Sequence, residues 1–84
     1  MRHARDAALD SIEAILAMLR ALPGLKERKR GTFYRKSSGF IHFHEDPSGM
    51  FADLKSGGDF VRFPLNRPGE ISSFLKAARK AAES

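Results

Sequence analysis

The chain has 84 residues, of which 42% are hydrophobic and 30% are charged, which is the composition of one small globular domain. This composition excludes a disordered or collagen-like chain, and the absence of cysteine excludes disulfides, thiolate metal sites and thiol catalysis. No run of about 18 apolar residues could span a membrane, and 15 Lys and Arg against 10 Asp and Glu give a net charge of +5, which favours nucleic acid or an acidic partner.

The chain begins with an amphipathic segment. Apolar residues recur three and four positions apart between Leu9 and Leu22, which predicts a helix over about residues 4–22. Pro23-Gly24 should end this helix, because the residue before proline disfavours helical geometry and glycine suits a left-handed exit. The segment carries charges and no signal-peptide pattern, so we expect a cytoplasmic protein without membrane contact.

Four β-favouring runs fill the middle of the chain, and a second amphipathic helix follows them. Turn-forming residues separate the runs, which predict strands over about 32–36, 40–45, 50–55 and 59–65. Apolar residues from Ile71 to Ala78 predict the final helix, over about 68–82. The expected fold is one α+β domain, 1–84, with a four-stranded antiparallel meander and both helices packed on one face, in the order α-β-β-β-β-α.

The turns between the strands predict which residues share a face of the sheet. A four-residue connection at 46–49 sets His42 opposite Asp53, and a two-residue Gly57-Gly58 turn sets Arg62 opposite Asp53. A three-residue loop is the alternative for this last turn, and it would exchange the faces of the last strand. Alternation then predicts a core face made of Tyr34, Ile41, Phe43, Met50, Ala52, Leu54, Val61, Phe63 and Leu65.

The opposite face is expected to be aromatic and basic. Its predicted residues are Phe33, Arg35, Phe40, His42, His44, Phe51, Asp53, Lys55, Phe60 and Arg62. A sheet surface that faces water normally carries polar residues, so four phenylalanines indicate that something covers this face. We interpret the protein as a non-enzymatic binding or interaction module that uses this face, with a second copy as partner, because homodimers are the commonest oligomers.

Single-stranded nucleic-acid binding on the same face is the alternative. The aromatic rings would stack on bases, while Arg35, Lys55 and Arg62 would contact phosphates. A basic run lies close by in the sequence, made of Lys26, Arg28, Lys29 and Arg30. Such a run next to a strand is also typical of a solvated loop.

A metal site at His42, His44 and Asp53 is the third interpretation. Alternate strand positions put both imidazoles on one face, and the predicted register puts the carboxylate opposite His42. Two histidines and one carboxylate are a known transition-metal ligand set that leaves coordination positions open. A simpler explanation is that Asp53 pairs with Arg62 or accepts a hydrogen bond from His42 without a metal.

Catalysis has little support in the sequence. His42 or His44 could act as an acid or base with Asp53 as its orienting partner. No serine lies in a nucleophile-elbow pattern, and Gly57-Gly58 lacks the other residues of a phosphate-binding loop. We therefore predict no catalytic residue and no cofactor.

Four segments of the chain resemble two families of small bacterial domains. They are residues 19–24, which end in Leu22-Pro23-Gly24, residues 32–35, residues 39–46, which contain His42-Phe43-His44-Glu45-Asp46, and residues 52–55. One family is labelled luciferase-like, and its leucine-proline-glycine element precedes a histidine-x-histidine strand. The other is the YjbR-like family, which has a similar helix end and a glutamate-aspartate turn. The resemblance implies a bacterial domain with a helix, antiparallel sheet, helix layout, and it implies neither luminescence nor another activity.

Overall fold

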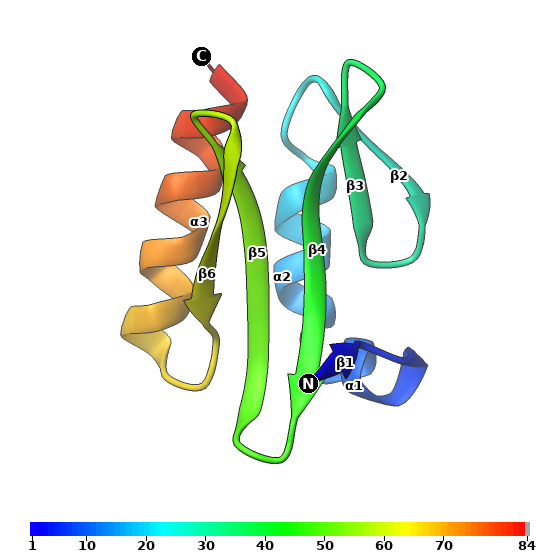
Figure 1. Cartoon of the computed structure of the whole chain (residues 1–84), viewed down its shortest axis with the longest axis vertical. Helices are drawn as coiled ribbons and strands as arrows, with labels where there is room; N and C mark the ends of the chain where they lie inside the picture. Colours follow the sequence, from blue (N-terminus) through cyan, green and yellow to red (C-terminus); the bar gives the residue numbers. More distant parts are fainter. Residues whose placement is uncertain (84) are drawn as a thin grey trace.

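The chain folds into an antiparallel sheet with helices from both ends of the sequence (Figure 1). The structure is a computed structural model that describes residues 1–83. Its elements in chain order are β1 (Arg2–His3), α1 (Asp6–Asp10), α2 (Glu13–Arg20), β2 (Leu25–Lys29), β3 (Thr32–Arg35), β4 (Ser38–Asp46), β5 (Gly49–Ser56), β6 (Asp59–Pro64) and α3 (Pro68–Glu83). The predicted α+β class is confirmed, and no helix in the described range is long and apolar enough to cross a membrane.

The sheet contains the predicted meander and two further strands. The meander is β3-β4-β5-β6, and every neighbouring pair in it is antiparallel. Strand β2 adds to the outer edge of β3, and β1 pairs with the part of β4 that β3 leaves free. The sequence does not predict β2 because four of its five residues are charged, a composition that also suits an edge strand that must not pair further.

The register of β4, β5 and β6 agrees with the prediction. Asp53 lies opposite His42 on one side and opposite Arg62 on the other. The last turn has two residues, Gly57 and Gly58, so the three-residue alternative is wrong. In the turn before β5, the backbone N–H of Ser48 donates to the Asp46 carboxylate over 3.1 Å, which closes the turn locally.

A β-bulge at Phe40 changes the faces of two predicted aromatic residues. Phe33 pairs with Ile41, whereas Tyr34 pairs with Gly39, so Phe40 is an extra residue in β4. The extra residue breaks the alternation of sides, and Phe40 and Phe33 are both buried in the core, with 5% and 1% of their surface exposed. Their predicted place on the opposite face is wrong, because the prediction assumed uninterrupted alternation through residue 40.

Because of the same bulge, Tyr34 and Arg35 also lie on other faces of the sheet than predicted. Tyr34 alternates with the buried Phe33 and is therefore not in the predicted core; its ring lies 5.0 Å from the Arg28 guanidinium. Arg35 alternates back to the side of Phe33, and its guanidinium lies 6.0 Å from the centre of the Phe40 ring. Arg35 thus also leaves the predicted binding face.

The predicted N-terminal helix is interrupted. It consists of α1 and α2, with the break at Ser11 and Ile12. The Ser11 hydroxyl donates to the carbonyl of Ala8 over 2.5 Å, and Ile12 has φ −119° and ψ 24°, outside the helical region. The C-terminal helix α3 runs to Glu83, close to its predicted end.

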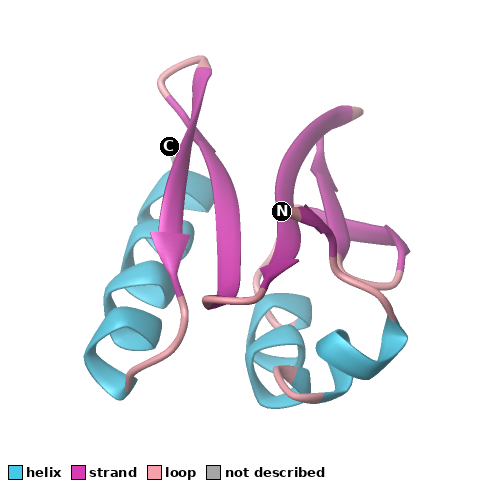
Figure 2. Ribbon diagram, turned by 60° about the horizontal axis from the view of Figure 1, so that its bottom comes forward, coloured by secondary structure: helices cyan, strands magenta, loops and turns pink. Residues whose placement is uncertain are grey.

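The core lies between the helices and one face of the sheet. Figure 2 shows the helices on one side of the strands. The largest side chains that this layer buries completely are Leu16, Leu19, Phe33, Ile41, Leu54 and Phe74. Val61, predicted in the core, is 44% exposed because it lies on the edge strand β6. We call the opposite side of β4, β5 and β6 the open face; its residues are His42, His44, Phe51, Asp53, Lys55, Phe60 and Arg62.

Candidate functional site

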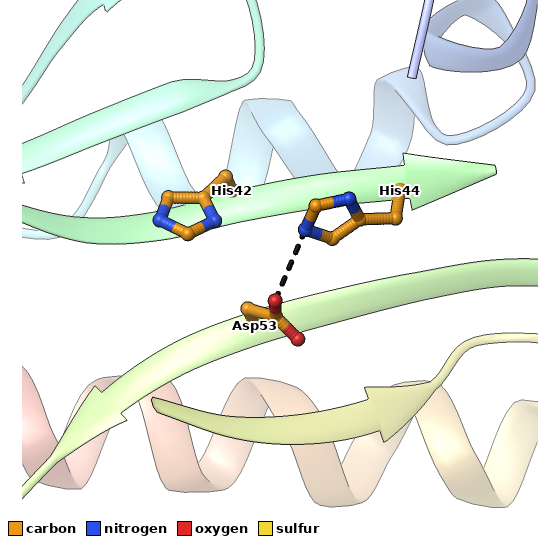
Figure 3. A group of neighbouring side chains, drawn as sticks. All are labelled: His42, His44 and Asp53. Atoms are coloured by element: carbon orange, nitrogen blue, oxygen red, sulfur yellow. Dashed lines mark ion pairs between the residues drawn. The ribbon is translucent and has the colours of Figure 1, made fainter. Parts of the chain in front are cut away.

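Two histidines and one aspartate meet on the open face. His42 and His44 occupy alternate positions of β4, and Asp53 comes from the neighbouring strand β5 (Figure 3). One ligand atom from each residue lies within 4.8 Å of the ligand atoms of the other two. The sequence predicted this juxtaposition, because the turn between β4 and β5 fixes the register.

Asp53 is a buried carboxylate held by an arginine. It is 8% exposed although it lies on the open face. Arg62 on β6 donates two hydrogen bonds to it, from Nε to Oδ1 over 2.8 Å and from Nη2 to Oδ2 over 2.9 Å. These bonds hold the pKa of Asp53 below its ordinary value, although burial acts in the opposite direction. The carboxylate is therefore ionised, and the predicted pairing of Asp53 with Arg62 is confirmed.

His44 is the imidazole that touches Asp53. Its Nε2 lies 3.0 Å from Oδ2 of Asp53, but the two groups are not aligned for a hydrogen bond. The expected hydrogen bond from His42 to Asp53 is absent within residues 1–83: the Nδ1 atom of His42 is buried without a hydrogen-bond partner in this range. Both imidazoles thus present a buried nitrogen whose hydrogen-bonding capacity is unused.

His42 is shielded from water by a phenylalanine. The centre of its ring lies 4.6 Å from that of Phe60. Burial is the largest influence on His42 and lowers its pKa below the ordinary value, although the Asp53 carboxylate acts in the opposite direction. The neutral form of His42 is therefore favoured, and neutral imidazole is the form that binds a metal ion.

The third histidine of the chain joins the same cluster. Strand β1 sets His3 opposite His44, and the ring centres of these two residues are 4.9 Å apart. Glu45 anchors this N-terminal segment, because it accepts hydrogen bonds from Arg2 Nη2 over 2.9 Å and from the backbone N–H of Arg5 over 2.8 Å. Sequence reasoning missed His3, because a strand of two residues has no periodicity to detect.

The remaining predicted face residues divide into two groups. Phe51 and Phe60 stay on the open face, and Phe60 is 45% exposed, whereas Phe33, Phe40 and Arg35 have moved to the core side. Two of the four predicted phenylalanines therefore remain for stacking on a partner. Nucleic-acid binding on the open face stays a prediction, and only two of the four phenylalanines expected to stack on bases lie on that face.

The basic run from Lys26 to Arg30 is not a loop. Its first residues belong to β2, and Arg30 follows the strand. Arg30 Nη2 lies 2.8 Å from carboxylate oxygens of both Asp10 and Glu13, so this cation holds the N-terminal helices against the sheet. The guanidinium of Arg30 is thus already paired with carboxylates of the same chain.

Comparison with known proteins adds no relative. No family model, no curated protein and no solved structure matches the chain. The resemblance to the luciferase-like and YjbR-like families stays a prediction. The function is therefore inferred from the geometry of the open face alone.

Proposed function

We propose that the protein is a small binding module that holds one divalent transition-metal ion of the zinc type between His42, His44 and Asp53. The observation that carries this proposal is the pair of buried imidazole nitrogens, His42 Nδ1 and His44 Nε2, that make no hydrogen bond within the described chain. Buried polar atoms are rarely left unpaired in folded proteins. A metal ion bound by both nitrogens and by the adjacent carboxylate would satisfy them together.

The distances in the cluster suit such an ion after a small adjustment. Zinc binds nitrogen and oxygen at about 2.0–2.2 Å, so ligand atoms of a tetrahedral site lie about 3.3 Å apart. The three ligand atoms lie within 4.8 Å of one another, so closing the site requires movements of about 1.5 Å at most. Changes in the histidine side-chain torsions could supply this movement, because both residues are only half-buried.

Three protein ligands leave further coordination positions of the ion open. Zinc sites with three protein ligands take water or another molecule in the fourth position. The neighbouring His3 is exposed, and its ring centre lies 6.2 Å from that of His42. We therefore expect the open position to be filled by His3, by water or by a donor atom of a partner molecule.

Arg62 would act as a positioning residue for the carboxylate. Its two hydrogen bonds leave each oxygen of Asp53 with another lone pair for an ion. The guanidinium charge would also repel a dication, so we expect an affinity lower than that of a structural zinc site. The donor set of two imidazoles and one carboxylate suits zinc, copper, iron and nickel.

The test is calorimetric titration of the metal-free protein with Zn²⁺, together with amide NMR spectra. We expect one ion per chain, with shifts at His42, His44 and Asp53, and a loss of affinity of about 100-fold or more in His42→Ala. Asp46→Asn is the control, because Asp46 is an acidic residue of the same strand outside the cluster. If His42→Ala retained its fold and bound zinc as tightly as the parent protein, the proposal would be refuted.

Self-association through β6 is a second candidate function. Phe60 and Val61 are neighbours on this edge strand and are 45% and 44% exposed. We expect Phe60→Ser to reduce a dimer in sedimentation equilibrium, at high as well as low salt, because apolar contacts are not screened. A parent protein that sediments as a monomer both with zinc and with a chelator would exclude this candidate.

A further inference from the structure

The three histidines of the chain form a triangle on the open face. Their ring centres are 4.9 Å apart for His3 and His44, 5.8 Å apart for His42 and His44, and 6.2 Å apart for His3 and His42. An imidazole that binds zinc at about 2.1 Å has its ring centre about 3.2 Å from the ion, so two rings of a tetrahedral site have centres about 5 Å apart. The triangle therefore has nearly the size that three imidazoles around one ion require.

A carboxylate adjoins this triangle. The Oδ2 atom of Asp53 lies 3.0 Å from Nε2 of His44, close to the separation of about 3.3 Å between two ligand atoms of a tetrahedral zinc site. The cluster thus offers one imidazole from β1, two from β4 and one carboxylate from β5. Four donors of this kind are the number that fills a closed tetrahedral site.

His3 is the donor that has to move. The ligand atoms of His42, His44 and Asp53 already lie within 4.8 Å of one another, whereas His3 lies outside this group. Its ring centre needs to approach that of His42 by about 1 Å to reach the spacing of a tetrahedral site. His3 is exposed, so rotation about its side-chain torsions can supply this movement without displacing the core.

Packing of the rings alone leaves the cluster incomplete. Ring centres 4.5–7 Å apart are about the usual spacing of aromatic pairs, so the distances by themselves also suit simple stacking. Stacking, however, leaves Nδ1 of His42 and Nε2 of His44 buried without a hydrogen-bond partner in the described chain. An ion shared with the exposed His3 would pair both nitrogens, and this separates the two explanations.

Strand β1 is held to the sheet by few bonds. It has two residues and lies beside the end of β4 (Figure 1). The backbone N–H of Ala4 donates to the carbonyl of Phe43 over 3.0 Å, and the carboxylate of Glu45 accepts the bonds from Arg2 and Arg5. An exposed strand of this length opens at low cost, and an ion that binds to the docked strand would hold it closed.

We propose that His3 is the fourth ligand of the ion, so that metal binding closes β1 onto the sheet and completes a site of three imidazoles and one carboxylate. This inference rests on the metal site proposed above and adds its regulatory consequence. The ion would have no coordination position left for a substrate. It would act as a latch that controls whether residues 2–5 are docked on β4.

The first test uses Co²⁺ as a spectroscopic probe of the metal-free, untagged full chain. We expect the strong visible absorption of four-coordinate cobalt, unchanged by added azide, because a closed site has no position for an external ligand. His3→Ala should bind Zn²⁺ about tenfold more weakly. Its cobalt spectrum should respond to azide, because water would take the position that His3 leaves.

The second test follows amide hydrogen exchange at Ala4 and Arg5. Zn²⁺ should slow this exchange in the parent protein, because the ion stabilises the docked strand, and it should not do so in His3→Ala. Arg2→Ala is the matched control, because Arg2 belongs to the same strand but lies outside the cluster. This control should keep the azide-insensitive cobalt spectrum. His3→Gln, which keeps a polar side chain of similar size, should behave as His3→Ala does.

The outcomes separate this inference from the metal site on which it rests. A parent protein that binds neither Zn²⁺ nor Co²⁺ would refute both. Equal zinc affinity of the parent protein and His3→Ala, or an azide-sensitive cobalt spectrum of the parent protein, would overturn the latch and leave the site at His42, His44 and Asp53 standing. Equal loss of affinity in Arg2→Ala and His3→Ala would also overturn it, because His3 would then act only through the strand.

Discussion

Arg62 and Asp53 form an unequal pair: the arginine side chain is 48% exposed, whereas the carboxylate that it binds with two hydrogen bonds is buried. We therefore predict that Arg62→Ala destabilises the protein more than Asp53→Ala does. Leaving the Asp53 carboxylate buried without its partner costs about 2 kcal/mol of the free energy of unfolding, whereas an unpaired Arg62 returns to water.

Urea unfolding of both variants measures this difference. The measurement is made without metal, so that loss of a bound ion does not contribute. Equal destabilisation by the two substitutions would contradict the unequal burial of the pair.

Alternation alone would place Phe40 and Phe60 on the same face of the sheet, but the bulge in β4 buries Phe40 in the core, so the two residues should contribute differently to stability. Phe40→Ala should lower the free energy of unfolding by about 3 kcal/mol or more, because it leaves a cavity in the core. Phe60→Ala should cost less than about 1 kcal/mol, because that ring is nearly half exposed. Denaturant unfolding of the two variants checks the bulge, and similar losses would show that Phe40 is not a core residue.

A side chain at Gly31 is expected to destabilise the fold. Its φ is 81°, and a Cβ atom would approach Cδ2 of Leu9 to 2.8 Å, so Gly31→Ala should lower the free energy of unfolding by about 1–3 kcal/mol. Gly39→Ala is the matched control, because no atom lies within 4 Å of a Cβ built there and its φ is ordinary. Thermal unfolding should show a lower Tm for the Gly31 variant only.

Glu27 should make stability depend on pH in the acid range. The pKa of Glu27 lies below 4.5, and the hydrogen bond that Arg20 donates is the largest cause. The backbone N–H of Gly31 donates a second hydrogen bond over 2.9 Å and lowers the pKa further, whereas burial and the charge of Glu13 raise it. A carboxyl whose folded pKa is depressed stabilises the fold fully above its unfolded pKa, and this contribution is lost as the pH falls through the folded pKa.

The variant Glu27→Gln isolates this contribution. We expect the parent protein to be more stable than the variant at neutral pH, and the difference to shrink as the pH falls below about 4.5. The free energy of unfolding, measured by urea titration at several pH values, checks this. A difference that stays constant down to pH about 2 would rule out the role of the ionised carboxylate.

Some residues of the candidate site can be predicted from the sequence, and others cannot. His42, His44 and Asp53 are predictable as one cluster, because alternation in β4 and the short turn at residues 46–49 fix their relative positions. His3 is not predictable, because it reaches His44 through a two-residue strand that pairs with a segment about forty positions away. Phe33, Arg35 and Phe40 are assigned to the wrong face, because one inserted residue reverses the alternation on its far side.

The sequence by itself determined the order of the four meander strands β3 to β6, the register from β4 to β6 and the residues that share the open face there. These features depend on local turn residues and on a period of two, which act between neighbours in the chain. The tertiary structure decided the bulge at Phe40, the pairing of the charged strand β2 and the pairing of β1 with β4. Each of these depends on packing between segments distant in sequence, whose contact energies outweigh local preference.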